Sequence, residues 1–145
     1  MPRNAPRVIP LDSVSPTPKE DAPTKVRIAR LVTRARCGSD LVLGVSWLDP
    51  GDKTNVWSTG QVDDGAAEHF YGDVEEAYYV LRGRLRLTWD DGVAEFGAND
   101  AVYLASGWKY ELENIGDEQA HLVYCFAPSP EETERPWGAA SGSEQ

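Results

Sequence analysis

A series of short segments with alternating apolar and polar residues constrains the fold of this chain more than any other feature. The strongest, Ala77 to Trp89, breaks at Gly83 and then alternates regularly as far as Trp89. A period of two puts successive side chains on opposite faces of a strand, so the pattern predicts a strand with one buried face. Short strands joined by Gly, Asp and Asn turns predict one all-β sandwich or closed barrel, with no internal repeat.

The rest of the central region repeats this pattern. In one segment, Leu41, Leu43, Val45 and Trp47 alternate cleanly with other residues, and we expect these four to share a buried face. Asp90-Asp91-Gly92 is typical of a hairpin turn. The further predicted strands are Val26 to Val32, Leu41 to Trp47, Val93 to Phe96, Ala101 to Leu104, Trp108 to Asn114 and His121 to Phe126.

The two ends of the chain differ from the centre in composition. Residues 1–24 are rich in proline, which interrupts regular hydrogen bonding, and we expect a flexible arm. Residues 129–145 are acidic and then rich in Gly and Ser, which indicates a flexible tail. The predicted domain therefore spans residues 25–128.

Charge and cysteine content narrow the functional class. The net charge of -10 disfavours nucleic acid and anionic membranes as partners. No secretory signal or membrane-spanning apolar run is visible. Cys37 and Cys125 lie far apart without C-x-x-C spacing, so neither a zinc site nor a disulfide framework is expected, and a reducing cytoplasm is the simplest setting.

Two motifs point to a known family. Residues 69–83, HFYGDVEEAYYVLRG, resemble the first cupin motif, with His69, Glu76 and Gly83 in matching positions and Tyr71 where the second histidine stands. Residues 99–114, NDAVYLASGWKYELEN, resemble the second, and here Gly107 and Asn114 match. Tyr110 stands at the position of the histidine, while Asn99 and Ala105 replace a glycine and a proline. The resemblance, over residues 41 to 127, implies a single cupin (RmlC-like jelly-roll) antiparallel β-barrel.

The resemblance also implies a ring of metal ligands inside the barrel, made here of His69, Tyr71, Glu76 and Tyr110. A neutral phenol is a poor ligand and must lose a proton with a pKa near ~10 before it binds well. A single metal ion, if bound, is therefore expected to be iron in preference to zinc. The alternative is a pocket without metal, in which the two tyrosines hydrogen-bond His69 and Glu76.

These residues leave two functions open. One is an enzyme acting on a small organic molecule, with Tyr71, Glu76 and Tyr110 as catalytic groups. Its chemistry would be proton transfer of the lyase, isomerase or cyclase type, or iron-dependent dioxygen chemistry. The alternative is a cupin that binds a small molecule without metal or turnover.

The predicted substrate-binding residues are aromatic: Trp57, Tyr78, Trp108 and Tyr124. His121 is expected at a surface or edge, not as a ligand. Small cupins are usually homodimers, and the exposed strand edge near Val26 to Thr33 gives a physical reason to expect a second subunit.

Overall fold

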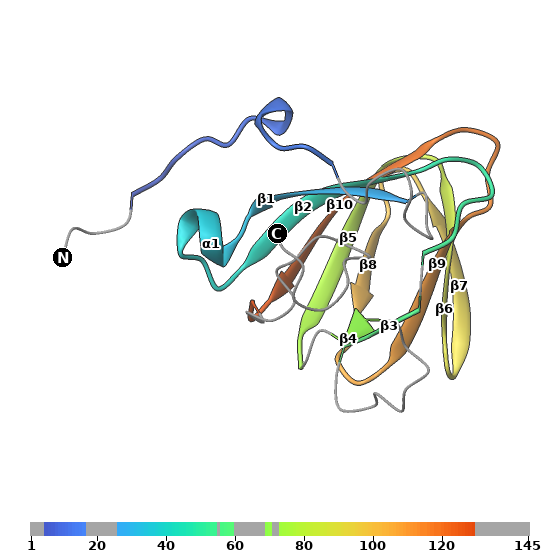
Figure 1. Cartoon of the computed structure of the whole chain (residues 1–145). Helices are drawn as coiled ribbons and strands as arrows, with labels where there is room; N and C mark the ends of the chain where they lie inside the picture. The colour runs from blue at the N-terminus through green and yellow to red at the C-terminus, as the bar shows by residue number, and fades with distance from the viewer. Residues whose placement is uncertain (1–4, 17–25, 55, 60–68, 71–72, 130–145) are drawn as a thin grey trace.

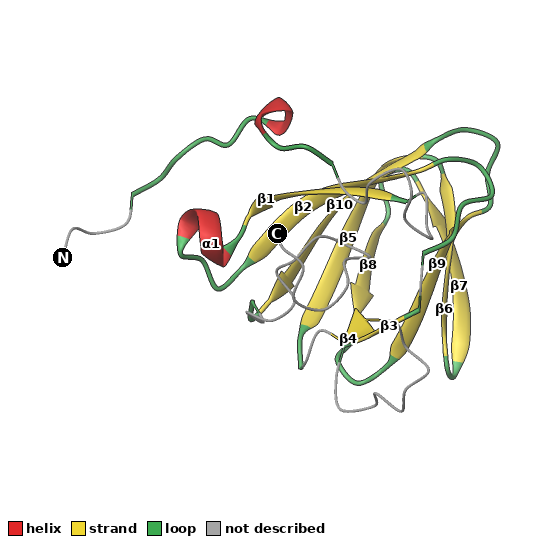
Figure 2. Cartoon of the chain, viewed as in Figure 1, coloured by secondary structure: helices red, strands yellow, loops and turns green. Residues whose placement is uncertain are grey.

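Figure 1 shows the computed structural model, which describes residues 5–16, 26–54, 56–59, 69–70 and 73–129; for Ser58, His69 and Phe70 it describes the backbone alone. Two five-stranded sheets face each other, and almost every strand pair is antiparallel (Figure 2). The first sheet has the order β1 (Arg27–Val32), β2 (Val42–Leu48), β10 (Ala120–Ala127), β5 (Glu75–Arg82) and β8 (Ala101–Leu104). The second has the order β4 (His69–Phe70), β3 (Trp57–Ser58), β9 (Lys109–Asn114), β6 (Arg84–Trp89) and β7 (Gly92–Gly97).

The all-β jelly-roll prediction is confirmed. Within the described ranges the two sheets are not joined by a hydrogen-bonded strand pair, so the architecture is a sandwich and not a closed barrel. The short β3 and β4 pair in parallel, and they are the exception to the antiparallel pattern. Helical structure is limited, in the described segments, to one turn of 3-10 helix at Leu11–Ser13 and the short α1 at Arg34–Cys37.

The hydrophobic core lies between the inner faces of the two sheets. The first sheet contributes fully buried Leu104 and Leu122, and the second contributes Leu85 and Leu112. Burial of such side chains contributes roughly 1.5–3 kcal/mol each to folding, so the packing of one sheet on the other holds the sandwich together.

The predicted inward face of β2 is wrong, although Val45 on that face is buried as expected. Val42 and Leu48 are fully buried, whereas Leu41 is 44% exposed. Trp47 stacks on His121 of the adjacent strand, with ring centroids 5.1 Å apart, on the face opposite the core. The outer face of this strand is itself apolar, so the alternation identified which residues share a face but not which face is inside.

Three turns position the strands that carry the site. Gly83 (φ 97°) joins β5 to β6, and a Cβ there would lie 2.7 Å from the Ala120 Cα. Asn99 has φ 72°, in agreement with the expectation that it replaces a glycine at a tight turn. The buried Asn114 donates through its amide to the carbonyls of Leu48 and Glu118, at 2.8 and 2.9 Å, and so fixes the loop that leads into β10.

The ends of the domain are described only in part. Residues 5–16 are mostly exposed, and Arg7 donates to the Arg36 carbonyl at 3.0 Å. The tail from residue 130 onward lies outside the described residues, so its predicted flexibility stays a prediction. β1 does form an edge of its sheet, as expected, while the homodimer that would cover it also stays a prediction. Both cysteines are free, and no helix in the described ranges is long and apolar enough to cross a membrane.

Candidate functional site

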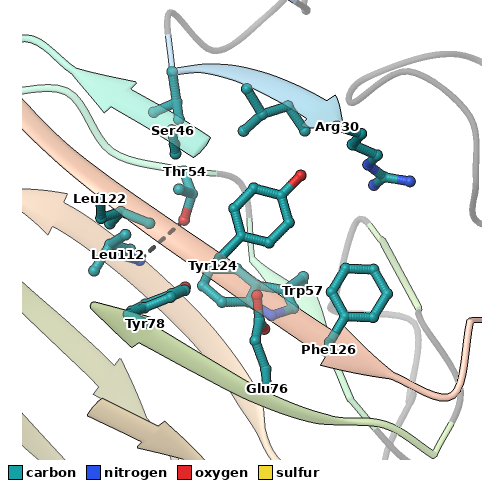
Figure 3. A pocket seen from close by; sticks show the side chains of 12 residues that line it. Arg30, Ser46, Thr54, Trp57, Glu76, Tyr78, Leu112, Leu122, Tyr124 and Phe126 are labelled. Atoms are coloured by element: carbon teal, nitrogen blue, oxygen red, sulfur yellow. Dashed lines mark hydrogen bonds between the residues drawn. The ribbon is translucent and has the colours of Figure 1, made fainter. Parts of the chain in front are cut away.

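A cavity of about 50 Å³ opens between the two sheets (Figure 3). Its walls are largely apolar and aromatic, and its ionisable side chains include one carboxyl, one guanidinium and tyrosine phenols. The residues that line it are Val26, Ile28, Arg30, Ser46, Thr54, Trp57, Glu76, Tyr78, Leu112, Leu122, Tyr124 and Phe126. Convergent polar groups in an apolar concavity are the usual mark of a small-molecule site.

The register of the first sheet brings the polar residues of this pocket together. Arg30 of β1 lies opposite Gly44 of β2, Gly44 lies opposite Tyr124 of β10, and Tyr124 lies opposite Tyr78 of β5. Glu76 is two residues before Tyr78 and therefore shares its face. Three strands, β1, β10 and β5, thus direct these side chains to one place, and Gly44 of β2 leaves room between them.

Glu76 is the acidic group of the pocket. Its carboxylate accepts a hydrogen bond from the Trp57 side chain, and the two are drawn side by side in Figure 3. Desolvation by burial raises the pKa of Glu76 from 4.5 to about 8, although the Trp57 hydrogen bond and the charge of Arg30 act in the opposite direction. At neutral pH a carboxyl with this pKa is mostly protonated and partly ionised, so both the acid form and the base form are present.

Tyr124 and Arg30 form the other polar end of the pocket. Burial raises the pKa of Tyr124, and the nearby Arg30 partly offsets that rise. The Tyr124 hydroxyl is buried, and the Arg30 side chain lies close enough to it to interact electrostatically. The Arg30 guanidinium carbon also lies 5.9 Å from the centroid of the Phe126 ring.

Two further hydroxyls line the pocket but are engaged by the backbone. Ser46 donates to the Arg27 carbonyl at 3.1 Å, and Thr54 accepts from the Leu112 amide at 2.9 Å. The Ser46 bond joins β2 to β1, and the Thr54 bond joins the loop before β3 to β9. Both residues therefore serve first to hold the walls of the pocket in place.

Tyr110 packs behind the pocket and does not line it. Its ring lies 5.7 Å from that of Trp57, and its hydroxyl donates to the Ala105 carbonyl at 2.6 Å. Burial, followed by the charge of Glu76, raises the pKa of Tyr110 to about 12. A phenol held in this way stays protonated and supports the position of Trp57.

The structure brings together only part of the predicted ligand ring. Glu76 and Tyr110 lie on either side of Trp57, and the backbone of His69 pairs with that of Trp57. The side chain of His69 and the whole of Tyr71 lie outside the described residues. Within the described ranges no group of three or more His, Cys, Asp or Glu side chains could hold a metal ion. Because the Tyr110 hydroxyl is engaged with Ala105, the described residues do not by themselves fit the metal that the motifs imply.

Three of the four predicted substrate-binding residues line the pocket in the structure. Trp57, Tyr78 and Tyr124 line the pocket, whereas Trp108 packs against the core and is not part of the lining. Sequence reasoning missed Arg30 and Gly44 entirely. Arg30 lies two residues after Ile28 in the first predicted strand, so alternation would put both side chains on one face, and this signal could have identified it.

His121 lies on the outer face of the first sheet, away from the pocket. It is partly exposed and stacks on Trp47, consistent with the predicted surface or edge position. Burial lowers its pKa below 6.5, and the charge of Arg82 lowers it further. The residue plays no part in the site described above.

Comparison with known proteins identifies the family. A family model described as "Cupin domain" matches residues 59–126, which include Glu76 and most of the sandwich strands. The chain belongs to the cupin superfamily. This confirms the resemblance of the two motifs.

Individual cupin relatives are distant. The chain is 23% identical over 128 residues to "Polyketide synthase CurC" of Streptomyces cyaneus, covering 88% of this chain and 73% of that protein. The polyketide cyclase RemF from Streptomyces resistomycificus matches with a TM-score of 0.65 and 16% identity over 86% of this chain and 81% of its own. A predicted oxalate decarboxylase from Thermotoga maritima matches with a TM-score of 0.66 and 17% identity, and the match covers 84% of this chain and 99% of that protein. At such identities the structural matches show the fold alone.

Proposed function

We propose that this cupin is an enzyme that moves a proton on a small organic molecule bound in the pocket between the sheets, with Glu76 as the general acid and base. The observation that carries the proposal is a carboxyl group in an apolar cavity, held by the Trp57 side chain and facing Arg30. Buried carboxyls whose pKa lies near the working pH are typical of catalytic acids and bases.

The geometry supports one sequence of events. Ionised Glu76 takes a proton from one atom of the bound molecule, and the carboxyl group protonated in this way then returns the proton to another atom of the same molecule. Trp57 keeps the carboxyl oriented through its hydrogen bond, and the apolar walls limit the access of water. Tyr110 is a positioning residue in this proposal, because its ring packs against Trp57 and its hydroxyl is bonded to the Ala105 carbonyl. Catalytic roles for Tyr71 and Tyr110 stay predictions.

The reaction class we favour is isomerisation or cyclisation. Both need a proton to be removed at one atom and returned at another, which a single carboxyl with a pKa of about 8 can do. The names of two relatives, a polyketide synthase and a polyketide cyclase, agree with chemistry on carbonyl compounds. The proposal uses no step through a metal.

Deuterium exchange tests this proposal without the natural substrate. Acetophenone in D₂O would be incubated with the protein, and exchange at the carbon next to its carbonyl would be followed by NMR. We expect exchange above the buffer rate, and Glu76→Gln should reduce it by roughly 10²–10⁴-fold. Glu75→Gln is the matched control, because Glu75 is exposed on the same strand and points away from the pocket.

Two results would change the conclusion. Exchange that is equal in the wild type and in Glu76→Gln would remove Glu76 from the chemistry. Exchange at the buffer rate in every variant would favour the second candidate, a non-catalytic binding cupin, which the engagement of Glu76 by Trp57 also suits. Elemental analysis of protein purified without chelators or a histidine tag tests the iron hypothesis separately, since stoichiometric iron would require His69 and Tyr71 to complete a ligand set.

A further inference from the structure

We propose that the pocket binds a small conjugated molecule through one anionic oxygen, a carboxylate or phenolate, and that Arg30 and Tyr124 hold this oxygen while Glu76 faces the rest of the molecule. The inference rests on the proposed function only in placing the ligand in the same pocket. It adds the charge and size of the ligand and two residues that determine specificity.

The first support is the way the backbone makes room for Tyr124. A Cβ at Gly44 would lie 2.7 Å from both Cζ and the hydroxyl oxygen of Tyr124. The phenol therefore lies across β2 at its one glycine and extends toward β1, where Arg30 is the register partner of Gly44. A larger residue at position 44 would clash with the Tyr124 phenol and also with the Ala29 carbonyl oxygen, which would lie 2.6 Å from its Cβ.

The second support is the chemistry of the groups at this end of the pocket. Tyr124 is only 6% exposed, and its hydroxyl has no partner of full geometry in the described part of the chain. Arg30 lines the same cavity and supplies a positive charge and several N–H donors. Two adjacent donors, one of them cationic, recognise an anionic oxygen.

The third support is the nature of the remaining walls. Ser46 and Thr54 direct their hydroxyls to the backbone, so they leave the ligand few polar contacts there. The other walls are aliphatic and aromatic, and Phe126 stacks near Tyr124 with ring centroids 6.2 Å apart. A cavity of about 50 Å³ is smaller than a whole ring, so the anionic oxygen and the part of the ring next to it enter the cavity while the rest of the molecule lies at its opening. The walls favour a flat apolar body, and Arg30 and Tyr124 favour one charged oxygen.

The test compares three single-ring probes by isothermal titration calorimetry. Benzoate provides the carboxylate, 4-nitrophenolate provides the phenolate, and benzamide is the neutral isostere of benzoate. We expect wild-type protein to bind at least one anion about tenfold or more tightly than benzamide. The tighter of the two anions identifies which acidic oxygen the site prefers. Benzamide binding as tight as that of both anions would overturn the proposal.

Variants assign the preference to the two residues. Arg30→Met should remove the preference for the anion, and Tyr124→Phe should weaken anion binding several-fold while leaving benzamide unchanged. Arg27→Met and Tyr79→Phe are matched controls, because both residues lie on the same sheet with exposed side chains on its outer face. Arg30→Gln is the second variant if Arg30→Met does not fold. Unchanged anion binding in the Arg30 variant would overturn the proposal.

The binding and exchange experiments fail separately. Glu76-dependent exchange in a protein with no preference for anions would overturn this inference and leave the proposed function standing. Arg30-dependent binding of an anion in a protein without Glu76-dependent exchange would overturn the proposed function and leave this inference standing.

Discussion

The pKa of Glu76 makes a prediction about stability that needs no ligand. The folded protein holds this carboxyl at a pKa of about 8, against 4.5 in the unfolded chain. The folded state therefore binds more protons between these values, and stability falls as the pH rises through this window. The full pKa difference lowers the free energy of unfolding by about 5 kcal/mol. This loss is absent below about pH 4.5 and complete above about pH 8.

Glu76→Gln removes this dependence, because glutamine stays neutral and its oxygen can still accept from Trp57. The free energy of unfolding of the variant minus that of the wild type should rise by about 2.5 kcal/mol as the pH goes from about 6 to about 9. Urea unfolding followed by circular dichroism at each pH measures the difference. The shifted pKa of His121 affects both proteins alike and cancels.

Glu75→Gln again serves as the control, since Glu75 is exposed at the start of the same strand. Its difference from the wild type should stay flat over this pH range. If the Glu76→Gln difference also stayed flat within about 0.5 kcal/mol, then Glu76 would have an ordinary pKa and the electrostatic reasoning for the pocket would be refuted.

Three further predictions concern positions outside the pocket. Asn114→Ala should lower the free energy of unfolding by about 2–3 kcal/mol in urea, because the buried Leu48 carbonyl, the Glu118 carbonyl and the Gly116 amide lose their partner. Asn99→Gly should be neutral or stabilising in the same assay, whereas Asn99→Val should cost about 1–2 kcal/mol because φ is 72°; equal effects of the two would contradict the turn assignment. By NMR, the imidazole signal that His121→Gln removes should titrate below 6.5, and Arg82→Gln should raise that pKa; an unshifted midpoint would show that neither burial nor Arg82 affects it.

Local patterns in the sequence predicted much of the fold. Alternation gave the strands, and the φ of Asn99 follows from its place in the second motif. For β2, however, the assignment of the inner face was reversed. Gly44 and Ser46 have the small size and polarity of outer-face residues, yet both lie on the inner face. Ser46 lines the pocket, and the absence of a side chain at Gly44 leaves room for Tyr124. Alternation alone contains no information about where a cavity is required.

The candidate site was predictable only where the family motif covers it. Glu76 was identified from the first motif, and three of the four predicted aromatic residues line the pocket. Arg30 was missed because it reaches the site through the pairing of β2 with β10, and these two strands are far apart in the chain. The bond from Tyr110 to the Ala105 carbonyl depends on the conformation of the turn between them, which residue types alone do not specify.

The central claim is that the cavity bounded by Glu76, Arg30 and Tyr124 is where this cupin binds its small molecule. A crystal structure of the protein grown with whichever of benzoate and 4-nitrophenolate binds more tightly in solution tests it most directly. The account predicts one ring between the sheets, with its charged oxygen within hydrogen-bonding distance of the Arg30 guanidinium and the Tyr124 hydroxyl. A ring bound only elsewhere on the protein, or one seated with its anionic oxygen pointing away from both residues, would contradict it.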